Sequence, residues 1–170
     1  MEYTDLIKDV KDFPKRGITF KDITPLLASP KYFSKVIDEL SLLLDEHFYG
    51  VKLISGIEAR GFIVGASMAS LNGFGFIPIR KEGKLPPPKN ATISTKEYGV
   101  DVLEVKQSEL LQDIVLVDDV LATGGTLKAA ESLLNNSGYN VIGAITLIDL
   151  SYLHEEVLIN GKPVYSLIKY

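Results

Sequence analysis

A continuous apolar run, IVLV at 114–117, leads directly into two acids and a glycine turn, and this succession limits what the chain can fold into. Branched apolar residues without alternation are typical of a strand buried on both faces, as in a parallel sheet. The segment 140–150 has the same character, and a helical pattern at 126–138 separates the two. This strand, helix, strand order favours an α/β domain with a mainly parallel central sheet.

The remaining elements are predicted from periodicity and from Gly and Pro positions. We expect a short amphipathic helix after Thr4 and a longer helix that starts after Ser29 and Pro30 and ends near Tyr49. Further along, we expect a strand at 51–55, a helix at 61–73, a strand at 75–81, a polar excursion outside the core at 82–98 and a strand at 100–106. A length of 170 residues is expected to form a single domain, 1–170.

Composition narrows the classes of partner and site. With 18 Lys and Arg against 22 Asp and Glu, the net charge of −4 offers no general attraction to nucleic acid or to an acidic membrane. The chain has no cysteine, so disulfides and thiolate metal sites are excluded. The first residues lack the pattern of a secretory signal, and no segment reaches ~18 uninterrupted apolar residues. We expect a cytoplasmic protein without a membrane or nucleic-acid partner.

The turn ATGGT, Ala122 to Thr126, lies between a predicted buried strand and a predicted helix start. Its backbone N–H groups can converge on an anion there, because glycine permits close approach and a helix N-terminus favours negative charge. Thr123 and Thr126 add hydroxyl donors beside Gly124 and Gly125. The common GxxxxGK[ST] and GxGxxG phosphate motifs are both absent, and an ordinary strand-to-helix turn is the alternative reading.

Asp118 and Asp119 come just before this turn, beside an expected anion site. Acids next to a phosphate are consistent with binding of hydroxyl groups or of a magnesium ion. A phosphate, adjacent hydroxyls and a divalent metal together describe a ribose 5-phosphate.

The stretch VLVDDVLATGGT (115–126) resembles the 5-phosphoribosyl-1-diphosphate (PRPP) motif of the type I phosphoribosyltransferases. Four further segments are similar to the adenine branch of that family: FPKRGITFKDITPLL (13–27), GIEARGFIVGA (56–66), IRKEGKLP (79–86) and EYGVDVLEV (97–105). The resemblance covers nearly the whole chain. It implies the type I phosphoribosyltransferase fold, with helices flanking a mainly parallel central sheet, a small hood and a flexible loop.

The resemblance also implies an activity in purine salvage: transfer of the 5-phosphoribosyl group from PRPP to adenine, giving AMP and pyrophosphate. It implies a homodimer in which a basic residue reaches the partner's site, and a Mg²⁺ ion that arrives mainly through PRPP, with Asp118 or Asp119 contributing through water. The implied PRPP-binding residues are Asp118, Asp119, Ala122, Thr123, Gly124, Gly125, Thr126, Arg60, Arg80, Lys81 and Lys84.

For adenine, the resemblance implies that Phe20 and Leu150 sandwich the ring while backbone groups of Thr19 and Lys21 read its edge. N-terminal residues ~1–30 would contribute to this base-binding hood.

Glu97, Tyr98 and Arg60 are the implied catalytic residues. Glu97 would manage the proton at N7, and Glu104 is its rival for that task. Glu97 also has the plain reading of an exposed loop acid.

Other readings stay open at this level. Arg60 can be a surface ion-pair residue, the Arg80–Lys84 segment a solvated loop face, and Phe20 a core residue. His47 and His154 have no partner pattern and are interpreted as structural or surface residues. A PRPP-sensing regulatory protein of the same fold and a non-catalytic interaction subunit are the alternative functions.

Overall fold

The computed structural model describes residues 2–96 and 99–170, and the chain divides into two compact units, Met1–Glu39 and Leu40–Tyr170. A single domain over 1–170 stays a prediction. In the described part of the chain, no helix combines the length and the apolar character needed to cross a membrane.

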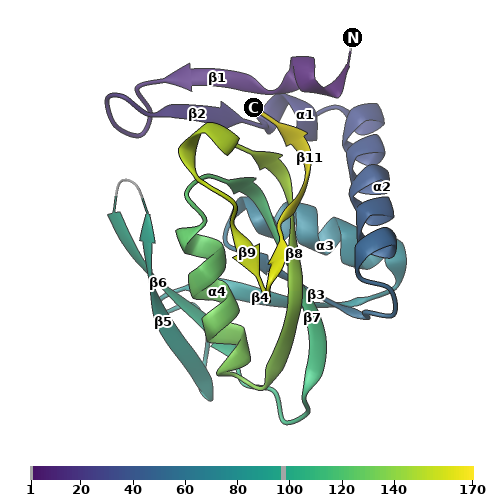
Figure 1. The fold of residues 1–170 in the computed structure, drawn as a ribbon, viewed down its shortest axis with the longest axis vertical. Coiled ribbons are helices and arrows are strands. Elements are labelled where there is room, and N and C mark those ends of the chain that lie inside the picture. Colours follow the sequence, from purple (N-terminus) through teal and green to yellow (C-terminus); the bar gives the residue numbers. More distant parts are fainter. Residues whose placement is uncertain (1, 97–98) are drawn as a thin grey trace. The chain divides into compact units, whose positions relative to one another are not determined.

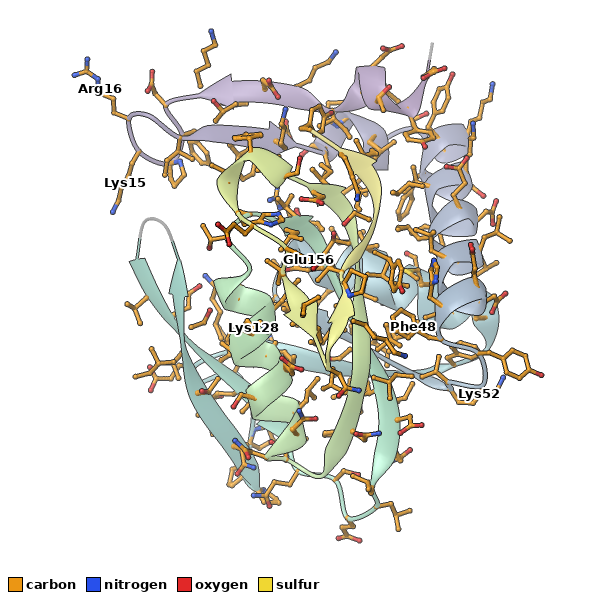
Figure 2. The ribbon with its side chains drawn as sticks, viewed as in Figure 1. Lys15, Arg16, Phe48, Lys52, Lys128 and Glu156 are labelled. Carbon is orange, nitrogen blue, oxygen red and sulfur yellow. The ribbon has the colours of Figure 1, made fainter. Side chains whose placement is uncertain are left out.

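The first unit contains an antiparallel hairpin (Figure 1) of β1 (Lys8–Lys11) and β2 (Thr19–Asp22). A 3₁₀ helix, Tyr3–Leu6, precedes the hairpin, and the short helix α1 (Thr24–Leu27) follows it. Lys15 and Arg16 extend away from the hairpin loop (Figure 2).

The amphipathic helix predicted after Thr4 is wrong, because most of that segment is the 3₁₀ helix and β1. Its apolar spacing does not mark one buried face, since Ile7 is buried while Val10 and Phe13 are exposed. The backbone of β1 pairs with β2 instead, with Val10 opposite Phe20. Pairing with a distant segment overrides local periodicity, which a single window of sequence cannot detect.

Helix α2 (Pro30–His47) confirms the prediction of a helix after Ser29 and Pro30, and it runs from the first unit into the second. Its buried residues recur at helical spacing: Val36, Ile37, Leu40 and Leu44.

The second unit is built on a seven-stranded sheet. Its order is β11 (Tyr165–Lys169), β8 (Tyr139–Asp149), β7 (Gln112–Leu121), β3 (Leu53–Ile57), β4 (Gly75–Lys81), β6 (Gly99–Lys106) and β5 (Lys89–Lys96). The strands from β11 to β4 are parallel to their neighbours, and β6 and β5 continue the sheet antiparallel. The predicted mainly parallel α/β sheet is confirmed.

Two helices connect parallel strands and cover opposite faces of the sheet (Figure 1). Helix α3 (Arg60–Asn72) joins β3 to β4 and ends at Gly73, whose φ of +66° is left-handed. Helix α4 (Gly125–Asn135) joins β7 to β8. From β3 the chain proceeds toward β4, and from β7 it proceeds in the opposite direction toward β8. The switch point between β3 and β7 is where α/β sheets bind ligands, beyond the carboxyl ends of the strands.

The core on the α4 side explains the continuous apolar run of β7. Within one cluster, Ile114 and Leu116 of β7 pack with Leu127, Leu133 and Leu134 of α4, and all five are almost fully buried. Burial of this kind contributes roughly 25 cal/mol per Å² of apolar surface, so the strand and the helix hold each other in place.

Two segments differ from the sequence-based expectation. The predicted excursion at 82–98 contains β5, which pairs with β6 in a hairpin. Residues 151–170 were assigned no element, yet they form a 3₁₀ turn (Ser151–Leu153), the small hairpin β9 (Leu158–Ile159) and β10 (Lys162–Pro163), and the edge strand β11. Both segments are strands whose pairing partner, rather than local pattern, determines their structure.

Candidate active site

The carboxyl ends of β3 and β7 lie side by side because these strands are paired, with Gly56 opposite Val117. One residue further along each chain come Ile57 and Asp118. The GIEAR turn and the two acids therefore meet at one edge of the sheet, as the motifs predict.

Asp118 and Asp119 are both largely buried, with 9% and 6% of their surface exposed. Asp119 Oδ2 lies 2.8 Å from Arg60 Nε, and Asp118 Oδ1 accepts a hydrogen bond of 3.0 Å from the Asp119 backbone N–H. The two side chains also hydrogen-bond to each other, and each has a further partner. Asp119 is paired with the first residue of α3, and Asp118 is bonded to the chain beside it.

Gly61 allows α3 to begin against the acids. A Cβ at this position would lie 2.6 Å from Asp118 Oδ1 and 3.2 Å from the carbonyl oxygen of Val117. These distances leave no room for a side chain. The glycine of GIEARG therefore allows the start of α3 to approach the acid pair closely.

Burial raises the pKa of Asp118 well above its usual value of 3.8, and the neighbouring charge of Asp119 raises it further. Burial also raises the pKa of Asp119, although the Arg60 guanidinium opposes that shift. Two buried acids with raised pKa values at the carboxyl end of a parallel strand are typical of a functional site. A bound ligand can supply groups that stabilise their negative charge.

The predicted phosphate loop, 122–126, connects the end of β7 to α4. Gly124 has a left-handed φ of +84° and precedes the first residue of α4, which has no side-chain cap. The N–H groups of an uncapped first turn point outward and are available to an anion. This agrees with the geometry expected for a phosphate.

Glu58, the acid of GIEAR, organises the basic segment after β4. Its Oε2 accepts hydrogen bonds from the Lys81 backbone N–H at 2.9 Å and from Arg80 Nε at 3.3 Å. These contacts lower the pKa of Glu58 below 4.5, the backbone N–H of Lys81 contributing most and the charge of Lys84 least. Arg80 and Lys84 therefore act on Glu58 through their charges, whereas the side chain of Lys81 is paired elsewhere, with its Nζ 3.4 Å from Asp101 Oδ2.

Glu104, the rival for the N7 proton, lies on β6 and is 3% exposed. Lys89 Nζ donates to its Oε1 at 2.6 Å, and this hydrogen bond is the main cause of a lowered pKa at Glu104. An ionised acid already paired with a lysine is poorly suited to carry a proton to or from a substrate.

The expected adenine contacts belong to both units. In the first unit, Phe20 on β2 packs edge-on against Phe13 with ring centroids 5.2 Å apart, and Lys21 Nζ lies 2.8 Å from Asp9. Leu150 of the second unit is buried after β8. Glu97 and Tyr98, two of the three predicted catalytic residues, lie outside the described residues, so their assignment stays a prediction.

Several residues with a part in this region were not predicted. Glu58 and Gly61 lie inside GIEARG. Their closeness to Arg60 in the sequence is the signal that could have identified them. Val157 packs against Gly124, and His154 pairs with Asp149 in a buried contact. No local pattern marks these later residues, since their partners are 5 to 33 positions away in the chain. The pair with Asp149 gives His154 a structural contact, which is one of the two readings left open for it.

Comparison with known proteins places this geometry in context. Residues 23–164 match the model of the phosphoribosyl transferase domain family. An adenine phosphoribosyltransferase from Streptomyces clavuligerus is 46% identical over 149 residues, which are 86% of this chain and 83% of that protein.

Solved structures of adenine phosphoribosyltransferases have a similar fold. The crystal structure of adenine phosphoribosyltransferase from Thermoanaerobacter pseudethanolicus superposes with a TM-score of 0.88 at 40% identity, covering 99% of this chain and 98% of that one. The enzyme from Saccharomyces cerevisiae, solved in complex with an imino-altritol bisphosphate and adenine, superposes with a TM-score of 0.85 at 32% identity, covering 96% and 95% of the two chains.

Proposed function

The chain belongs to the phosphoribosyl transferase family, on its adenine branch and with the type I fold, and from that premise we propose how its residues divide the reaction among them. The observation that carries the proposal is the buried Asp118–Asp119 pair, held against Arg60 at the switch point and followed by the glycine loop.

The reaction is transfer of the 5-phosphoribosyl group from PRPP to adenine, which gives AMP and pyrophosphate in purine salvage. N9 of adenine forms the new bond to the anomeric carbon, and the carbon–oxygen bond to pyrophosphate breaks with its electrons leaving on pyrophosphate. Adenine loses one proton. The sugar is cationic on the way, so the protein must stabilise a departing polyanion and a transient cation together.

The loop 122–126 binds the 5-phosphate through its amides and the Thr123 and Thr126 hydroxyls. The pyrophosphate is met by the GIEAR turn with Arg60 and by Arg80, Lys81 and Lys84. The contacts of Glu58 with Arg80 and with the Lys81 backbone N–H support this division, because they join the GIEAR turn to the basic end of β4. A local basic cluster is required because the whole chain carries a net charge of −4.

Asp118 and Asp119 hold the ribose hydroxyls and face the part of the sugar that becomes positive. Their raised pKa values support this role, because burial disfavours their negative charge and a bound cation with hydroxyl donors would stabilise it. The interaction is strongest in the transition state, where it accelerates the reaction instead of only tightening binding.

A Mg²⁺ ion is part of the proposal, and the donor set fits one that is held mainly by substrate. In residues 2–96 and 99–170, no group of three or more His, Cys, Asp or Glu side chains is arranged so that it could hold a metal ion by itself. Asp118 and Asp119 can supply at most one or two ligands, directly or through water, which is the number magnesium usually takes from protein beside phosphates. When bound, the ion neutralises charge on the leaving pyrophosphate.

For adenine, Thr19, Phe20, Lys21 and Leu150 are proposed contacts, and each can be replaced separately. Glu97 accepts the N7 proton, which the ion pair of Glu104 supports by engaging the rival acid. Tyr98 and the surrounding loop exclude water from the reacting centre.

A homodimer in the cytoplasm completes the proposal. All three relatives described above are named adenine phosphoribosyltransferases, so a PRPP-sensing regulator has no support from them.

A single assay tests the function. Purified protein is given PRPP and Mg²⁺ with adenine, hypoxanthine or guanine, and nucleotide formation is measured for each base. We expect AMP from adenine and little product from the two 6-oxopurines, with activity lost on chelation of Mg²⁺. Equal turnover of hypoxanthine would contradict the adenine assignment.

A further inference from the structure

The chain that follows β8 returns across the phosphate loop. Residues 150–160, here called the brace, pass from the end of β8 through the 3₁₀ turn Ser151–Leu153 to β9. Val157 of the brace lies directly against Gly124, because a Cβ on that glycine would lie 2.7 and 2.9 Å from the two Val157 methyl carbons. Val157 also packs on the hydrophobic core beneath α4.

The phosphate loop, 122–126, needs a side chain packed against it to keep its backbone in one conformation. Gly124 has a left-handed backbone and no side chain, and the first turn of α4 lacks a side-chain cap. A glycine segment loses more conformational freedom on ordering than any other, so its phosphate-binding geometry depends on what packs against it. Val157 is a contact of this kind.

The brace is attached on both sides of the loop. On the β7 side, the Leu150 backbone N–H donates to the Leu121 carbonyl at 2.9 Å, one residue before the loop begins. On the α4 side, Lys128 Nζ donates to the Leu158 carbonyl, and the Asn160 backbone N–H donates to Glu131 Oε1 at 2.6 Å. Lys128 projects from α4 in Figure 2. The two ends of the phosphate loop are thus linked through one segment.

A further contact of the brace pairs two largely buried side chains, His154 and Asp149. His154 Nε2 lies 2.8 Å from Asp149 Oδ1, and the side chains are 10% and 8% exposed. His154 Nδ1 also contacts the carbonyl oxygen of Glu155. Asp149 is opposite Leu121 in the sheet, so the pair connects the brace to the strand position from which the loop departs. Removing the imidazole would leave a buried carboxylate without this partner, which is a costly arrangement.

We propose that His154 and Asp149 are positioning residues for the 5-phosphate, acting through the brace and Val157 on the backbone of Gly124. The proposal rests on the proposed function of the loop 122–126. It makes the geometry of the proposed phosphate site depend on a histidine whose hydrogen-bond partners, Asp149 and the Glu155 carbonyl, lie outside the loop.

The test compares steady-state kinetics of His154→Ala, His154→Gln and Val157→Ala with the unchanged protein, together with calorimetric titration of PRPP. For His154→Ala and Val157→Ala we expect KM for PRPP to rise about three- to tenfold, the factor that corresponds to one lost hydrogen bond or a similar contact. KM for adenine should change much less, because Leu150 keeps its own hydrogen bond to Leu121. His154→Gln should restore most of the loss, since its amide nitrogen reaches the position of Nε2.

His47→Ala is the matched control. This second histidine of the chain stacks on Tyr165 with ring centroids 3.6 Å apart and has no part in the brace. It should change thermal stability and leave KM for PRPP as it was.

An unchanged KM for PRPP in both His154→Ala and Val157→Ala would overturn the proposal, as would a rise confined to KM for adenine. If His154→Ala does not fold, Val157→Ala decides the question in the same way. Failure of the proposed function would look different, since the unchanged protein would then form no AMP. Titration of PRPP would still report on the loop in that case.

Discussion

At the scale of single residues, the role proposed for Asp118 and Asp119 implies a conflict between stability and activity. Asp118 is buried next to another acid, and its nearest partner is the backbone N–H of Asp119. A carboxylate held in this way gains little from folding when ionised. Such sites are kept because the ligand compensates, and they are common where charge develops during a reaction.

The prediction at this scale is that Asp118→Asn stabilises the ligand-free protein and impairs catalysis. Because folding raises the pKa of Asp118, the folded state holds its proton more tightly, and the free energy of unfolding falls as pH rises from 3.8 through the raised pKa. The asparagine amide does not ionise, so the free energy of unfolding of Asp118→Asn does not fall in this way. At neutral pH we expect it to exceed that of the unchanged protein by about 0.5–2 kcal/mol. We expect kcat to drop about 10²-fold, with a smaller loss of PRPP affinity.

Urea denaturation at several pH values and steady-state kinetics measure both effects. Asp45→Asn, at an exposed acid of α2, is the control for a simple change of net charge. If the free energy of unfolding depends on pH in the same way in Asp118→Asn and in the unchanged protein, ionisation of Asp118 does not destabilise the fold.

At the scale of elements, β3 and β4 are coupled at their carboxyl ends as well as along their ladder. The Glu58 backbone N–H donates to the Ile79 carbonyl at 2.9 Å, and the Glu58 side chain returns to Arg80 and to the Lys81 backbone N–H. The turn after β3 and the basic end of β4 therefore form one unit. If this region binds pyrophosphate as proposed, Glu58 serves it by orienting the basic end of β4.

Glu58→Gln tests this coupling. The amide oxygen can still accept from Lys81 N–H, but the charge attracting Arg80 and Lys84 is lost, so we expect KM for PRPP to rise about two- to fivefold with kcat nearly unchanged. The pKa of Glu58 is lowered by folding, so its contribution is present above 4.5 and lost as pH falls through the lowered pKa. The stability difference from the unchanged protein, about 0.5–1.5 kcal/mol at pH 7, should therefore shrink in acid.

Thermal denaturation between acidic and neutral pH, with PRPP kinetics, checks this expectation. Glu82→Gln removes an exposed acid from the same segment and should have neither effect. A loss of kcat without a change in KM for PRPP would assign Glu58 to the reacting centre instead.

At the scale of the whole molecule, the resemblance predicts that the active form is a homodimer whose basic segment serves the partner's site. Lys84 is exposed in the turn after β4 and is the residue of that segment best placed to test it. We expect a particle of twice the 18.7 kDa chain mass in sedimentation.

Complementation then tests the shared site. Lys84→Ala and Asp118→Asn chains, each weakly active alone, are unfolded together and refolded as a mixture. In a mixed dimer, one site would carry both defects and the other neither, so about a quarter of all sites should recover. Dimers that form without any recovery would show that Lys84 acts within its own subunit.

Much of the site was predictable from the sequence because its residues are close together in the chain. Residues 118–126 and 56–61 each combine a buried strand, a turn and a helix start, and local physics determines all three. Apolar runs specify the strands, glycines specify the turns, and parallel strands bring their carboxyl ends to one edge. The acid pair, Arg60 and the glycine loop therefore meet where the motifs predict.

Tertiary structure decided what depends on partners far away in the chain. Local pattern did not reveal β1, β5 or β11, because each is a strand only through its neighbour. The same holds for the contact of Val157 with Gly124. His154 and Asp149 are only five positions apart, but their pairing follows no regular period, because the chain turns out of β8 between them. A contact between distant residues leaves no periodicity to read, since its energy is gained only after the sheet has brought the two segments together.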